Sequence, residues 1–277
     1  MQDKTRAYLQ EVISRYLNND ARIVGVLAQL GQDSPYIVAI HMYCKRIRTR
    51  GWDWLNAQWT PSDACITANE AEPGYREFQR CISGVRTQFE SQAAMALYTL
   101  RVNPRRTLDD QVGLWNNNRN IPAQGTALLR LVERRLRRRE YPDPLTAESA
   151  QAFVDWFVAL NDPETTNAAP GLTDHGLMQA ADFVVYTRRG AQVAGASTSQ
   201  ASIDLWEGRN ANTPVNFSAA LNTAVRAFNR SEPEARFDRQ HLQAPYEPWH
   251  YRYLRVVVDQ AIQACVTETA ANAEAGQ

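Results

Sequence analysis

The chain has 277 residues, enough for one large domain or two smaller ones whose core needs no disulfide or metal to stabilise it. Its 30 lysines and arginines balance 30 aspartates and glutamates, so the net charge gives no indication of nucleic-acid binding. A hydrophobic content of 44 % with 22 % charged residues excludes an intrinsically disordered chain.

The four cysteines are widely spaced and include no Cys-x-x-Cys pair, which argues against a cysteine zinc site. Cys65 and Cys81 could form one disulfide outside the cytosol, or both could stay reduced. The first residues carry no apolar segment after their charges, so no Sec-type signal peptide is expected. No stretch approaches eighteen consecutive apolar residues, and we expect no membrane-spanning helix.

Residues 1–105 predict a helical N-terminal domain. Apolar residues recur there with the helical period, and the expected helices cover residues 8–17, 23–30, 36–42 and 75–100. The segment Asn-Pro-Arg-Arg-Thr at 103–107 breaks the pattern and marks the expected domain boundary.

Two features of the helical segments allow two interpretations each. Trp52, Trp54 and Trp59 occupy a loop-like segment and could pack between helices or form an aromatic platform for a glycan. A run of arginines over 130–139 could be a solvated helix face or a surface attracted to an anionic wall polymer or lipid headgroup.

Residues 106–277 predict a second domain of mixed character. Helices are expected over 126–140, 146–161 and 216–229, and strands over 183–187, 192–194 and 250–253. Arg189 and Gly190 form the turn between the first two strands. The chain is therefore expected to be α+β, with a helical N-terminal part followed by a small antiparallel sheet with flanking helices.

Three of the four histidines lie in this second part, namely His175, His241 and His250. A loop delivers His175 and Asp182 begins a predicted strand, so the two side chains could converge at the mouth of that strand. Two imidazoles and one carboxylate, with the fourth position left for water, are typical of a catalytic zinc site. A ligand set with His241 in place of Asp182 is the alternative.

The segment Glu247-Pro-Trp-His250 supplies the remaining groups of this hypothesis. Pro248 disfavours the helical conformation of the residue before it, so Glu247 is expected in an extended segment or a turn. This arrangement differs from the helical His-Glu-x-x-His motif, in which helix spacing puts two ligands on one face. Glu247 is the candidate carboxylate that would take a proton from the attacking water.

Two segments together resemble a known family. The stretch Pro170-Gly-Leu-Thr-Asp-His-Gly-Leu-Met-Gln-Ala-Ala-Asp182, followed by Glu247-Pro-Trp-His250-Tyr, resembles the VanY-like D-alanyl-D-alanine carboxypeptidases. The same zinc peptidase family includes the L-alanyl-D-glutamate endopeptidases of phage lysins. Its pattern is roughly Pro-Gly-x-Ser-x-His-x-x-Gly-x-Ala-x-Asp and then Glu-Pro-Trp-His before an aromatic residue. Thr173 replaces the serine and keeps a hydroxyl, whereas Met178 replaces a glycine.

The resemblance implies that His175, Asp182 and His250 are zinc ligands and that Glu247 is the catalytic base. It also implies an arginine, with a glutamine five residues on, that binds a substrate carboxylate or carbonyl near the metal.

Arg119 and Gln124 have this spacing and are the expected pair, with Arg188 and Arg189 as alternatives for the arginine. Thr173 and Trp249 are the other expected substrate-binding residues.

The resemblance covers residues 106–277 and implies a zinc-dependent peptidoglycan peptidase, either a carboxypeptidase or an endopeptidase, that hydrolyses stem-peptide or cross-link bonds. Such a substrate lies outside the cytoplasm, in the periplasm or cell wall. Release of a phage lysin or injection of an antibacterial effector would reconcile this with the absence of a Sec signal. Expected partners are peptidoglycan peptides, with an immunity protein or a secretion component as further candidates. The alternative is a non-catalytic cell-wall-binding protein that retains the peptidase fold.

Overall fold

The computed structural model describes residues 2–30, 33–102, 106–137, 145–161, 168–177, 179–238 and 246–254. They form two compact units, each assembled from separate stretches of the chain. Among the described residues, the first unit contains residues 2–61 and 107–173, and the second contains residues 62–106 and 174–254. Helices and a small antiparallel sheet are both present, which confirms the α+β class.

The first unit is helical throughout its described residues. Its helices are α1 (Asp3–Arg15), α2 (Ala21–Gln29), α3 (Asp33–Arg50), α4 (Trp52–Gln58), α7 (Leu108–Asn116), α8 (Asn120–Arg137) and α9 (Ala147–Ala159). Helix α3 is buried along most of its length, and α8 and α9 pack against it. Gly125 permits the close approach of α8, because a Cβ there would lie 2.4 Å from the Cβ of Ser34 at the start of α3.

The tryptophan-rich segment is not a loop. Gly51, at a φ of 84°, precedes α4, and this helix contains Trp52 and Trp54. Trp59 follows the helix and is 3 % exposed, with its ring tilted against that of Tyr43 at 6.1 Å between centroids. Trp59 is therefore part of the core of this unit.

The second unit contains the sheet. Its helices are α5 (Asp63–Asn69), α6 (Pro73–Glu90), the 3₁₀ helix η1 (Ala93–Met95), α10 (Gln200–Trp206) and α11 (Phe217–Ser231). Its strands are β1 (Tyr98–Val102), β2 (Ala180–Thr187), β3 (Gln192–Ala194), β4 (Phe237–Asp238) and β5 (His250–Tyr253). The strands are ordered β1-β2-β5-β4, with β3 also paired to β2, and all pairs are antiparallel.

Strand β2 has different partners along its length. Residues 183–187 pair with β1, while Ala180, Ala181 and Asp182 pair with Arg252, Tyr251 and His250 of β5. Directly opposed residues of an antiparallel pair project to the same face of the sheet, and successive residues alternate between faces. Asp182 and His250 therefore share one face, and their neighbours Phe183 and Tyr251 share the other.

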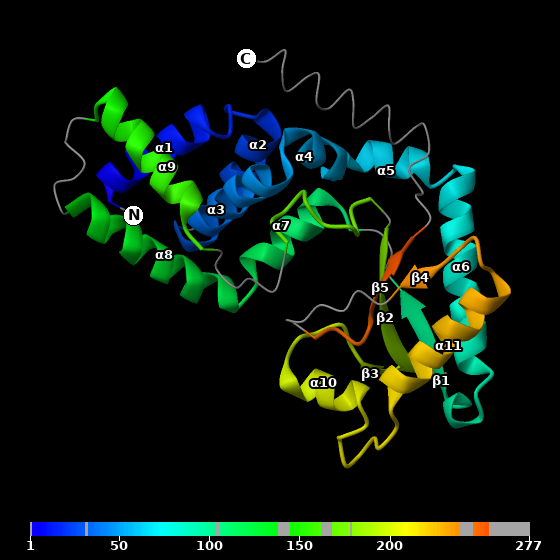
Figure 1. Ribbon diagram of the computed structural model, residues 1–277. Helices are drawn as coiled ribbons and strands as arrows, with labels where there is room; N and C mark the ends of the chain where they lie inside the picture. Colours follow the sequence, from blue (N-terminus) through cyan, green and yellow to red (C-terminus); the bar gives the residue numbers. More distant parts are fainter. Residues whose placement is uncertain are drawn as a thin grey trace. The chain divides into compact units, whose positions relative to one another are not determined.

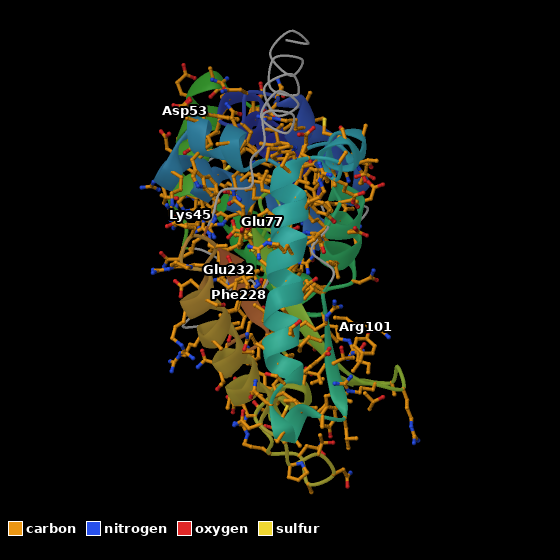
Figure 2. All side chains as sticks on the ribbon, turned by 90° about the vertical axis from the view of Figure 1, so that its right-hand side faces the viewer. Lys45, Asp53, Glu77, Arg101, Phe228 and Glu232 are labelled. Carbon is orange, nitrogen blue, oxygen red and sulfur yellow. The ribbon has the colours of Figure 1, made fainter. Side chains whose placement is uncertain are left out.

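The second face is covered by an aromatic core. Helices α6 and α11 lie side by side here (Figure 1), and Figure 2 labels Phe228 and Glu232 of α11 next to α6. Ring centroids 5.0–6.2 Å apart link the core members Phe78, Phe183, Phe228, Phe237, Tyr251 and Tyr253. This burial fixes which face of β2 and β5 is left for polar side chains.

The compact units differ from the predicted domains 1–105 and 106–277. Residues 75–100 were expected to form one helix, but α6 ends at Glu90 and the chain continues into β1 from Tyr98. The aromatic and β-branched residues of Tyr-Thr-Leu-Arg-Val favour a strand, and β1 is stabilised by pairing with β2. Because α6 also packs on α11, residues 62–106 belong to the unit that contains the sheet.

The other predicted elements of the second domain are present. Strands at 192–194 and 250–253 match β3 and β5, and the predicted strand 183–187 lies within β2. Gly190, at a φ of 92°, forms the turn of the hairpin. Cys81 has a free, buried thiol and Cys65 is disulfide-bonded, so a Cys65–Cys81 disulfide is not formed. Among the helices described, none has the length and apolar character needed to cross a membrane.

Candidate metal centre

Three side chains of the second unit converge as expected of a metal site. One potential ligand atom from each of His175, Asp182 and His250 lies within 4.8 Å of the others. Nδ1 of His250 is 2.8 Å from Oδ1 of Asp182, and Nε2 of His175 is 3.3 Å from Oδ2. The ring centroids of His175 and His250 are 5.2 Å apart, and the ring planes are inclined by 69°. Two nitrogen donors and one carboxylate suit a divalent ion such as Zn²⁺.

The backbone explains how these residues meet. Asp182 and His250 are opposite each other in the β2–β5 pair, on the face away from the aromatic core. His175 lies in a turn that ends at Gln179, whose N–H donates to the carbonyl of Asp174 at 2.9 Å. The carbonyl of Gln179 accepts a bond from the N–H of Tyr253 at 2.7 Å, so this turn is fixed to the end of β5.

The segment Glu247-Pro-Trp-His250 is a β-turn. The N–H of His250 donates to the carbonyl of Glu247 at 3.2 Å, three residues back, with Pro248 at the position where its fixed φ is favoured. This confirms that Glu247 does not lie in a helix. The turn places a carboxylate at the entrance to β5, immediately before the ligand His250.

The pKa shifts of Asp182 and His175 favour the protonation states that bind a metal, whereas the shift of His250 favours its charged form. Burial alone would raise the pKa of Asp182, but His175 and His250 hold it well below its usual range. Burial lowers the pKa of His175 in spite of the adjacent carboxylate. An ionised carboxylate and a neutral imidazole are the forms that bind metals. Burial would also lower the pKa of His250, but its hydrogen bond to Asp182 raises it instead.

Glu247 differs from Asp182 although both are carboxylates of one site. Burial, reinforced by the negative charge of Asp182, raises the pKa of Glu247 to about 7. A carboxyl group that titrates near neutrality can both accept and return a proton, whereas Asp182 stays ionised. The two groups therefore have the properties of a proton carrier and a ligand.

Arg106 is the residue that the sequence prediction missed. Its Nη2 donates to Oδ2 of Asp182 at 2.9 Å, so a guanidinium lies directly beside the ligand cluster. Arg106 has a glutamine, Gln111, five residues on, which is the same spacing that led to the choice of Arg119 and Gln124. This spacing was the available signal, but Arg106 lies within the segment 103–107, which was assigned to a domain boundary, and it was not considered as a site residue.

The predicted pair, Arg119 and Gln124, belongs to the other compact unit. Arg119 is exposed between α7 and α8, and Gln124 lies on α8, so both belong to the helical unit. Gln111 also belongs to that unit: its amide donates to Oγ1 of Thr60 at 2.9 Å and accepts from the N–H of Gly171 at 2.7 Å. Gln111, which lies five residues after Arg106, is thus hydrogen-bonded within the helical unit.

Two further expectations need correction. Trp249 was assigned to substrate binding, but it is 2 % exposed and its ring contacts Trp206 at 6.1 Å between centroids, so it belongs to the core. The alternatives Arg188 and Arg189 follow β2 at the end opposite Asp182, and six residues of strand at about 3.3 Å each separate Asp182 from Arg188. Thr173 is half-buried at the end of a stretch that belongs to the helical unit. Met178 and His241 lie outside the described residues.

No family model matches this sequence, and neither the curated proteins nor the solved structures that were compared with it give a match. The arguments for a function therefore rest on the residues of the cluster and their geometry.

Proposed function

We propose that this protein is a zinc-dependent peptidase that hydrolyses peptide bonds of peptidoglycan, in the stem peptide or in the cross-link. The observation that supports it best is the convergence of His175, Asp182 and His250 within 4.8 Å, beside a turn that presents Glu247. Both histidines are nearly buried, with 4 % and 7 % exposure, so the ligand atoms are shielded from competing water. The motif resemblance to the VanY-like carboxypeptidases supplies the substrate class.

A zinc ion bound by these three residues would polarise the scissile carbonyl and acidify the attacking water. Glu247 accepts the proton of that water as its oxygen bonds to the carbonyl carbon. It then donates the proton to the leaving nitrogen as the C–N bond breaks. In the metal-free protein, burial raises the pKa of Glu247 to about 7, so its carboxylate is a stronger base than that of a solvated glutamate.

Arg106 takes the role proposed for the family arginine. Its side chain is 29 % exposed and its guanidinium adjoins the candidate ligands, so Arg106 can reach an anionic group of a bound peptide. Charge-assisted bonds from arginine to a carboxylate or a developing oxyanion are strong and directional. Arg106 would therefore orient the peptide relative to Glu247 and the metal ligands.

The test is digestion of purified sacculi and of synthetic stem peptides by zinc-loaded protein, followed by mass spectrometry of the products. Hydrolysis at one defined bond (D-Ala–D-Ala, D-Ala–diaminopimelate or L-Ala–D-Glu), lost with chelator and with Glu247→Gln, supports the proposal. Intact peptides after prolonged incubation with zinc-loaded protein would contradict it. Binding to sacculi without hydrolysis would favour a non-catalytic wall-binding protein.

A further inference from the structure

Both carboxylate oxygens of Asp182 are engaged, and one of them has two nitrogen neighbours. Oδ1 bonds to His250 at 2.8 Å, whereas Oδ2 lies 2.9 Å from Nη2 of Arg106 and 3.3 Å from Nε2 of His175. The Asp182 side chain is 14 % exposed, so these contacts are only partly screened by solvent. The guanidinium therefore shares its acceptor oxygen with a histidine that belongs to the ligand cluster.

The ion pair between Arg106 and Asp182 opposes the binding of a metal ion. A divalent cation held by His175, Asp182 and His250 would bring positive charge close to a guanidinium that bonds to one of its own ligands. Two cations beside one partly buried carboxylate repel each other, and each weakens the other's interaction with it. Arg106 and the metal ion are thus competitors for Asp182.

We propose that Arg106 and the metal ion are thermodynamically coupled through Asp182. Metal binding weakens the Arg106–Asp182 ion pair and releases the guanidinium toward the anionic group of a substrate. This inference rests on the proposed function for the identity of the substrate, but the competition itself concerns only the metal. The coupling implies an order of binding: Arg106 becomes available for a carboxylate-bearing peptide once the metal ion is bound.

The direction in which zinc affinity changes when Arg106 is removed distinguishes this coupling from a simpler role, in which Arg106 only orients Asp182. If Arg106 only oriented Asp182, its removal would weaken metal binding, as loss of an outer partner of a ligand does. If Arg106 competes with the metal, its removal strengthens metal binding, and coupling between two sites typically amounts to a factor of about 5–150.

The experiment measures zinc affinity by competition with a chromophoric chelator for the full chain, Arg106→Met and Arg106→Lys. Arg101→Met is the matched control, since Arg101 lies on β1 (Figure 2), stacks on Tyr186 at 4.3 Å and has no part in the cluster. We expect Arg106→Met to bind zinc roughly tenfold more tightly than the unaltered protein. Arg106→Lys, which keeps the positive charge, should be closer to the unaltered protein, and Arg101→Met should match it.

Weaker or unchanged zinc binding by Arg106→Met would overturn the coupling. Circular dichroism of each chelator-treated variant shows whether it is folded, and if Arg106→Met is not, Arg106→Gln is measured in its place with the same expectation. If zinc affinity changes as expected but the protein does not hydrolyse sacculi, the proposed function is refuted and the coupling between Arg106 and the metal ion still holds. Unaltered protein that binds no zinc would refute both.

Discussion

Asp182 and His250 are 68 residues apart in sequence, yet they face each other directly across the β2–β5 pair and their side chains are joined at 2.8 Å. The register of two short strands thus sets the distance between two candidate ligands. A shift of one residue would place one of them on the aromatic face of the sheet. The candidate metal site and the aromatic core are therefore specified by the same pairing.

The ligand assignment predicts loss of metal in single variants. His175→Ala, Asp182→Ala and His250→Ala each remove one of the three donors, and zinc content measured after dialysis should fall from about one equivalent to near zero. Asp238→Ala is the control, because Asp238 is an exposed acid on the neighbouring strand β4. Full zinc content in Asp182→Ala would show that a different residue completes the site.

Glu247 should be needed for turnover but not for metal binding. Glu247→Gln keeps the size of the side chain and removes its ability to carry a proton. We expect kcat to fall by about 10²–10⁴-fold with zinc content unchanged. Rates of peptide hydrolysis and metal analysis on the same preparation check this. A Glu247→Gln protein of undiminished activity would contradict the assignment of the base.

Stability of chelator-treated protein should depend on pH through Glu247. Its pKa is raised from 4.5 to about 7 in the folded protein, so the folded state binds more protons than the unfolded state between these values. The stability contributed by the protonated carboxyl is complete below about pH 4.5 and is lost as the pH rises through about 7.

Glu247→Gln should therefore be more stable than the unaltered protein above pH 7, by at most about 3 kcal/mol, and the difference should vanish toward pH 4.5. Urea denaturation at several pH values measures it. The exposed Glu234→Gln variant controls for the loss of one negative charge. A difference that grows toward acidic pH would have the wrong sign.

Substitutions of Arg106 and Arg119 are expected to have different effects on the kcat/KM of peptide hydrolysis. Loss of one charge-assisted hydrogen bond costs about 1.5–3 kcal/mol, so Arg106→Met should lower kcat/KM by about ten- to a hundredfold. Arg119→Met should leave kcat/KM unchanged, because Arg119 is exposed and is not among the described residues that contact Asp182 or the two histidines. Steady-state kinetics of both variants on one stem peptide test this, and the reverse result would restore the sequence-based choice.

Two glycines should respond in opposite ways to alanine. A Cβ at Gly84 of α6 would lie 2.6 Å from a ring carbon of Phe228, which is buried beside Phe237 and cannot easily move. Gly84→Ala should destabilise the protein by about 1–3 kcal/mol.

Gly113 of α7 has no atom within 4 Å of such a Cβ, so Gly113→Ala should stabilise by about 0.5–1 kcal/mol through helix propensity. Urea midpoints measure both changes. Equal effects of the two substitutions would show that α6 and α11 do not pack as described.

The sequence predicted those parts of the site that depend on local pattern. His175, Asp182, Glu247 and His250 lie in two short motifs, and the proline alone predicted the non-helical turn at Glu247. The strand β5 and the hairpin of β2 and β3 followed from composition and turn residues. Each of these features is determined by residues that are neighbours along the chain.

The sequence did not predict the features that depend on distant partners. Tyr98–Val102 continues the apolar pattern of the preceding helix, and its pairing with β2 joins segments about 85 residues apart. Arg106 bonds to Asp182, a residue 76 positions away, and no local spacing encodes that contact. Trp249 was expected to bind the substrate, but its side chain is buried and its ring contacts that of Trp206, which is distant in sequence.

The helical stretch 107–173 interrupts the unit that contains the sheet, and this limits how the protein can be dissected. A fragment that begins at residue 106 would lack α6 and β1. Residues 183–187 would then form an open strand edge prone to intermolecular pairing, and Phe228 would lose its cover. A piece that starts near residue 62 would restore these contacts, but it would leave α8 and α9 without α1 and α3, against which they pack. A fragment expected to keep His175, Asp182 and His250 in register therefore has to include α1–α4 as well.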